Sequence, residues 1–96
     1  MSEPKARSSE KLLTSEQIRA ARALLGWRAE DLAIASSVGV ATIRRAELAA
    51  QKTSMTAANN LALRRALESA GVDFIDENGG GPGVRLRKRS MARSTK

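Results

Sequence analysis

Apolar residues recur at helical spacing through much of the chain, and this spacing predicts amphipathic helices. The first helix is expected at about 15–25. A capping box opens it, in which the Thr14 hydroxyl accepts a hydrogen bond from the Gln17 amide and the Gln17 side chain accepts one from Thr14. Gly26 follows the last apolar position and is expected to end the helix in a left-handed conformation.

Two shorter helices are expected next, at about 30–35 and 40–48, joined by a tight turn. The first of them opens with Glu30 and Asp31, which lie where the helix dipole favours negative charge. Val38 is apolar within the turn, so it is expected to pin the turn into the core. This contact would fix the angle between the two helices.

Alanine and leucine form the apolar face of a fourth helix, which Thr56 is expected to cap and Gly71 to end. Beyond Gly71 apolar and polar residues alternate in two runs, separated by turn-forming residues at 77–83. This pattern predicts a β-hairpin at 72–88. A two-stranded ribbon is marginal by itself, so the hairpin is expected to pack on the helices or against another subunit.

The length of 96 residues leaves room for one domain. We expect a disordered arm at 1–13, a helical domain at 14–75 that leads into the hairpin, and a disordered basic tail at 89–96. No apolar run approaches the roughly 20 residues of a membrane span, and the polar start of the chain lacks a signal-peptide core. A cytoplasmic protein that does not enter membranes is therefore expected.

Composition narrows the possible chemistry, because the chain contains no cysteine and no histidine. Disulfides, thiolate zinc sites and cysteine nucleophiles are excluded, and no metal, cofactor or enzymatic activity is expected. The net charge is +7, and most of the excess lies near the C-terminus, where the run RLRKR at 85–89 suits a polyanion. Arg64 and Arg65 of the fourth helix are expected to be solvated.

One ordered set of residues extends from the first helix to the hairpin. Its members are Arg22, Leu25, Gly26, Trp27, Glu30, Asp31, Leu32 and Ala33, then Val38, Ala41, Thr42, Ile43 and Glu47, and lastly Arg65, Ala66, Leu67, Gly71, Val72, Asp73 and Phe74. With this set, residues 16–75 resemble the lambda-repressor-like, or XRE-type, helix-turn-helix proteins. The resemblance implies a compact, mainly α, four-helix DNA-binding domain whose third helix enters the major groove.

The resemblance assigns base reading to the exposed early positions of the third helix: Val40, Ala41, Arg44 and Arg45. Val40 and Ala41 can offer only apolar contact, for instance to a thymine methyl group. Arg44 and Arg45 have the forked geometry that matches guanine O6 and N7. Arg45 is the favoured base reader by resemblance, and phosphate binding is the alternative role for one of the pair.

Three positions depart from the family pattern. Ala29 replaces the usual phosphate-clamping glutamine, Ser37 the usual turn glycine, and Gly39 the usual hydroxyl cap of the third helix. Ser37 in a left-handed conformation should cost about 1 kcal/mol. Phosphate contacts are expected instead from Arg28, Thr42 and Lys52, with further contacts from Arg85, Arg87, Lys88 and Arg89.

The resemblance also implies a structural salt bridge between Arg22 and Glu47, which would tie the first helix to the third. The alternative is that both side chains are solvated.

These features predict a sequence-specific transcriptional regulator that binds double-stranded DNA as a homodimer and has no small-molecule ligand. The hairpin is the expected dimer element, through edge-strand pairing or through the apolar face of Val84 and Leu86. The alternative is a helix-turn-helix module, antitoxin-like or antiactivator-like, that binds another protein.

Overall fold

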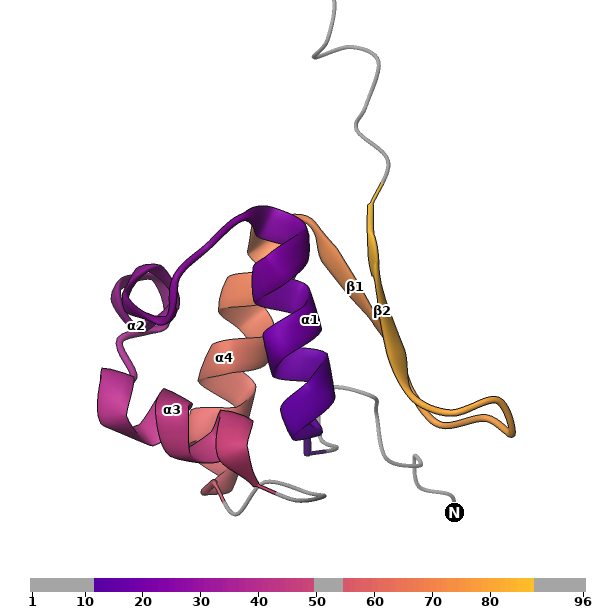
Figure 1. Ribbon diagram of the computed structural model, residues 1–96, viewed down its shortest axis with the longest axis horizontal. Coiled ribbons are helices and arrows are strands. Elements are labelled where there is room, and N and C mark those ends of the chain that lie inside the picture. Colours follow the sequence, from indigo (N-terminus) through magenta and orange to yellow (C-terminus); the bar gives the residue numbers. More distant parts are fainter. Residues whose placement is uncertain (1–11, 50–54, 88–96) are drawn as a thin grey trace, which may run out of the picture.

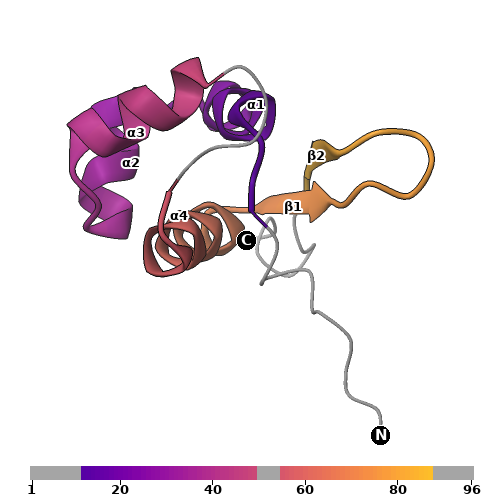
Figure 2. The ribbon, with the colours of Figure 1, turned by 90° about the horizontal axis from the view of Figure 1, so that it is seen from below.

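Four helices and one hairpin follow one another in the computed structural model, which describes residues 12–49 and 55–87. The helices are α1 (Ser15–Leu25), α2 (Ala29–Ser36), α3 (Val40–Leu48) and α4 (Ala57–Ser69), and the strands are β1 (Val72–Ile75) and β2 (Gly83–Leu86). Helices α2 and α3 lie on one side of the molecule and the hairpin on the other, with α1 and α4 between them (Figures 1 and 2). The predicted mainly helical architecture with a C-terminal hairpin is confirmed.

The ends of α1 and α4 carry the predicted capping interactions. Thr14 Oγ1 accepts from the Gln17 amide at 3.0 Å, and Gln17 Oε1 accepts from the Thr14 amide at 3.0 Å. Gly26 ends α1 with a φ of 70°. Thr56 Oγ1 accepts from the Asn59 amide at 3.1 Å at the start of α4. These boundaries follow from local hydrogen bonds that the sequence alone encodes.

The turn between α2 and α3 places Ser37 in the left-handed region, with a φ of 63°. Val38 is buried in the core, as predicted, so the turn is fixed on its inner side. Gly39 precedes α3 without a side-chain cap. The turn therefore fixes the relative position of the two helices although it lacks both a glycine at its left-handed position and a hydroxyl cap.

Replacing Ser37 with glycine should stabilise the domain by up to about 1 kcal/mol, because glycine has no Cβ to clash in the left-handed region. The melting temperature should rise by a few degrees, at roughly 4–8 °C per kcal/mol. Ser36→Gly is the matched control. The Ser36 hydroxyl donates to Leu32 O at 2.7 Å and accepts from the Val38 amide at 3.2 Å, so this variant should melt lower. An unchanged or lower melting temperature for Ser37→Gly would show that the turn stores no strain.

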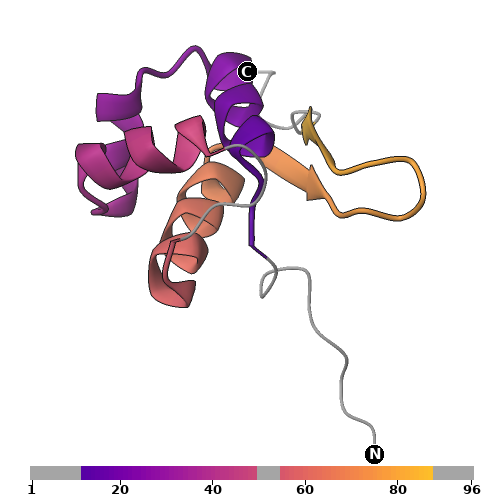
Figure 3. The same cartoon turned by 60° about the horizontal axis from the view of Figure 1, so that its bottom comes forward.

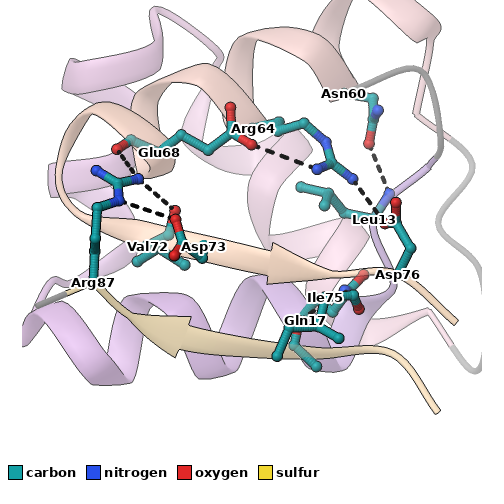
Figure 4. Close-up of polar contacts among 11 residues, drawn as sticks. Leu13, Gln17, Asn60, Arg64, Glu68, Val72, Asp73, Ile75, Asp76 and Arg87 are labelled. Atoms are coloured by element: carbon teal, nitrogen blue, oxygen red, sulfur yellow. Dashed lines mark hydrogen bonds and ion pairs between the residues drawn. The ribbon is translucent and has the colours of Figure 1, made fainter. Parts of the chain in front are cut away.

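The core draws apolar side chains from every helix, from β1, from the turn between α2 and α3, and from the segment that precedes α1. Its buried members are Leu13, Ile18, Ala21, Ala29, Leu32, Val38, Ile43, Ala46, Leu63, Leu67 and Val72. The predicted arm at 1–13 is therefore wrong at its last residue. Leu13 is fully buried, and its amide donates to Asn60 Oδ1 at 2.8 Å (Figure 4). The rest of the arm, apart from Leu12, lies outside the described residues.

The hairpin packs on the helices through its apolar face. Its strands are antiparallel, with Val72 opposite Leu86 and Phe74 opposite Val84. Val72 is buried, and Phe74 and Val84 pack against the core, which leaves Leu86 half-exposed at the rim. The expectation that Val84 and Leu86 form an apolar dimer face is thus corrected for Val84, because the helices of the same chain already cover it.

Arg64 is not solvated, in contrast to the prediction, whereas Arg65 is exposed as expected. The Arg64 side chain is 1% exposed, because it lies beside β1 with its guanidinium 4.9 Å from the centre of the Phe74 ring. Its nitrogens lie 3.5 Å from Asp76 Oδ1 and 3.6 Å from Glu68 Oε2 (Figure 4). Arg64 is buried because the hairpin packs along α4 and covers its side chain. The sequence pattern of α4 by itself shows only a polar residue at this position.

Candidate nucleic-acid interface

Helix α3 has one buried and one exposed face. Ile43, Ala46 and Glu47 are buried, whereas Ala41, Arg44 and Arg45 are exposed. Figure 3 shows α3 at the outer side of the molecule, next to α2. Two adjacent guanidinium groups, the methyl group of Ala41 and the exposed side chain of Leu48 are therefore presented on a single helix of nine residues.

The two exposed arginines of α3 differ in their partners. Arg44 Nη2 forms an ion pair with Glu30 Oε2 in the first turn of α2, and the two side chains are 53% and 51% exposed. Arg45 Nη2 donates to the hydroxyl of Thr42, one turn earlier on its own helix, at 3.4 Å. Among the residues that the structure describes, no carboxylate pairs with Arg45, whereas Arg44 shares its charge with Glu30.

The C-terminal half of α3 is anchored to α1 by the predicted salt bridge. Arg22 Nε lies 2.6 Å from Glu47 Oε2 and Arg22 Nη2 lies 2.7 Å from Oε1, so the pair is bidentate. The Glu47 side chain is 9% exposed and that of Arg22 is 22% exposed. Arg22 Nη1 also donates to Trp27 O at 2.9 Å. The alternative that both side chains are solvated is excluded.

Hydrogen bonding to Glu47 raises the pKa of Arg22 above its ordinary value, against a smaller lowering by burial. Because the pKa in the folded state is raised, the contribution of Arg22 ionisation to stability is complete below the pKa of the unfolded arginine and is lost as the pH rises through the folded-state pKa in strong alkali. Arg19 adds a second anchor that sequence reasoning missed, since its Nη1 donates to the carbonyl oxygen of Glu47. Its position three residues before Arg22 places it on the same side of α1, which is the signal that the sequence offers.

The other predicted contact residues are scattered. Val40 is half-buried and packs against the core, so Ala41 is the more accessible apolar contact. Arg28 is exposed immediately before α2, and Thr42 borders a hollow of about 170 Å³ between α3 and the start of α4. Lys52, Lys88 and Arg89 lie outside the described residues.

The hairpin arginines are not brought together with those of α3, because the hairpin lies across α1 and α4 from it (Figures 1 and 2). Arg87 has a structural role. Its Nε lies 3.0 Å from Asp73 Oδ1, and its Nη2 donates to Glu68 O at 3.1 Å and to Val72 O at 3.3 Å (Figure 4). Arg85 pairs more loosely with Asp73, at 3.6 Å, and is the freer cation of the two.

Comparison with models of known protein families and with curated proteins gives no match to this chain. Within residues 12–49 and 55–87, no three acidic side chains cluster as they would around a metal ion. None of the helices in these two ranges combines the length and apolar character needed to cross a membrane. The chemistry of the described surface near α3 is thus that of exposed guanidinium groups on a well-anchored helix.

Proposed function

We propose that this protein is a lambda-repressor-like helix-turn-helix protein that binds double-stranded DNA and reads its sequence with α3. The observation that carries the proposal is the combination of exposed Arg44 and Arg45 with a buried anchor at Glu47. A reading helix must present hydrogen-bond donors outward while the rest of the domain keeps it in a fixed position. The pair of Glu47 with Arg22 supports the second requirement.

Each exposed side chain of α3 has a matching group on DNA. An arginine fork can donate two hydrogen bonds to guanine O6 and N7, and the Ala41 methyl suits a thymine methyl. Arg28, exposed before α2, and Thr42, within α3, are proposed to bind phosphates, which position a protein on the duplex without reading its sequence. Net charge of +7 supports attraction to a polyanion.

We further propose that the protein regulates transcription as a homodimer. One reading helix covers only a few base pairs, so helix-turn-helix proteins gain specificity by binding two half-sites. The hairpin offers the dimer element. The Arg87 amide donates to Gly71 O, so by alternation the backbone groups of Val84 and Leu86 point to the outer edge of β2. A second copy could pair there, next to the half-exposed Leu86 side chain.

A second candidate function is the binding of another protein through α2 and α3. Ile34 and Leu48 favour it, because these large apolar side chains are 81% and 83% exposed. Ile34→Ser and Leu48→Ser separate the two functions. Neither should change DNA preference if Arg44 and Arg45 read the site, whereas both should abolish a protein contact made through this surface.

Replacing Arg45 with alanine should reduce the preference for a selected site over scrambled DNA by about tenfold, since a well-formed arginine to guanine contact contributes about 1–3 kcal/mol. The site is first selected from a random duplex pool with wild-type protein, and binding is then measured by fluorescence anisotropy. Arg65→Ala is the control, because Arg65 is an exposed arginine of α4. It should leave the preference unchanged.

A wild-type protein that selects no sequence from the pool would contradict the proposal. A dimer is tested separately by sedimentation of the protein on its selected duplex. A single copy on a palindromic site at micromolar concentration would exclude the dimer and leave DNA reading intact.

A further inference from the structure

We propose that Glu30 determines specificity by positioning Arg44 for base reading and by withholding its charge from phosphates. The proposal rests on DNA binding by α3, and it names a residue of α2 as part of the reading apparatus. The two side chains belong to different helices and lie 14 residues apart in the sequence. Their ion pair therefore depends on how the intervening turn places α2 against α3.

Glu30 is not needed to cap α2, although it lies in the first turn. Asp31 does this work, because its Oδ2 accepts a hydrogen bond from the Arg28 amide at 2.8 Å. The Glu30 carboxylate is thus free to bind across to α3. Both side chains of the pair are half-exposed, so the pair adds little to the stability of the domain, since ion pairs at the surface contribute about 0–1 kcal/mol. Its effect should appear in binding.

Ion pairing changes what an arginine can do on an exposed helix. Without its carboxylate partner, the Arg44 guanidinium could reach whichever phosphate lies nearest, whatever the base sequence at that place. A guanidinium has five N–H donors, so Arg44 can donate to Glu30 and still present donors to guanine O6 and N7. The same carboxylate repels phosphates near Arg44. Glu30 would therefore favour the base contact over the backbone contact.

Arg45 provides the internal contrast. Its partner, Thr42, is an uncharged hydroxyl on the same helix, so nothing in the described residues neutralises the Arg45 charge. The two neighbouring arginines proposed as base readers thus differ in what holds them in place. Arg44 is held across the helix pair by a carboxylate, and Arg45 is left to approach DNA with its full charge.

The test is Glu30→Gln, which keeps the shape of the side chain and removes its charge. Affinity is measured for the selected duplex and for a scrambled duplex across a series of salt concentrations. We expect affinity for scrambled DNA to rise, discrimination to fall about fivefold to tenfold, and the salt slope to steepen by about one unit. Glu16→Gln is the matched control, because Glu16 is exposed in the first turn of α1 and its described partner is the Ser15 hydroxyl. It should leave discrimination unchanged.

A double-mutant cycle assigns the effect to the pair. In an Arg44→Ala background, Glu30→Gln should have no further effect on discrimination. If Glu30→Gln behaves like Glu16→Gln, or lowers discrimination equally in both backgrounds, Glu30 does not act through Arg44 and the inference is wrong. A cooperative melting transition within a few degrees of wild type confirms that the variant is folded. If the wild type prefers no sequence, the proposed function fails first, and the inference fails with it.

Discussion

Replacing Glu47 with alanine should lower the melting temperature by about 12–24 °C. Breaking a buried ion pair by removing one partner costs about 3–5 kcal/mol, because the remaining charge is left without compensation. We take about 3 kcal/mol, since the Arg22 side chain is 22% exposed and can recover some hydration. A domain of this size loses roughly 4–8 °C per kcal/mol. The loss is a large share of the roughly 5–15 kcal/mol that stabilises a small domain.

Thermal unfolding followed by circular dichroism measures this effect, with Glu30→Ala as the control. Glu30 also forms an ion pair with an arginine, but both side chains of that pair are half-exposed, so its loss should change the melting temperature by a few degrees at most. A fall of less than about 2 °C for Glu47→Ala would remove the salt bridge from the account of how α3 is fixed.

Replacing Arg64 with alanine should lower the free energy of unfolding by about 2–4 kcal/mol, whereas Arg64→Met should lower it by less than about 1.5 kcal/mol. The Arg64 side chain is buried, yet its carboxylate partners lie 3.5 Å and 3.6 Å away, well beyond the roughly 2.8 Å of a strong charged hydrogen bond. Its Nε has no hydrogen-bond partner within the described part of the chain. The side chain therefore stabilises the domain mainly through its volume and its contact with Phe74, and methionine replaces most of both.

Denaturant unfolding of the two variants tests this contrast. Asp76→Asn should lower the free energy of unfolding only slightly, because the ion pair that it removes is long and partly exposed. Equal losses for Arg64→Ala and Arg64→Met would mean that charge, and not packing, gives Arg64 its role.

Sequence patterns predicted the helix ends because their determinants are local. The capping box of Thr14 and Gln17 and the left-handed Gly26 involve residues no more than a few positions apart. Arg64 was missed because its burial depends on the hairpin, which folds back onto α4 from later in the chain. The helical spacing of Asn60, Arg64 and Leu67 places them on one buried face, so the sequence carries a periodic signal, but a charged residue at such a position is ordinarily expected to be solvated.

The candidate site was predictable to a different extent. The pair of Arg22 and Glu47 came from a family resemblance, since no rule of local spacing connects residues 25 positions apart. The pair of Glu30 and Arg44 was not predicted, because it depends on the angle between α2 and α3. The turn between the two helices sets that angle through the left-handed Ser37 and the buried Val38. The burial of Val38 depends on packing in three dimensions, which a local sequence pattern does not specify.

Gln17 links two parts of the molecule that could otherwise open independently. Its side-chain oxygen caps α1, and its Nε2 donates to Ile75 O at 3.3 Å and to Gly83 O at 3.0 Å (Figure 4). Release of the hairpin would therefore remove two hydrogen bonds from the residue that closes the first turn of α1. Backbone amides of these segments should exchange with solvent as one cooperative unit, so the hairpin is a part of the folding unit and not an appendage to it.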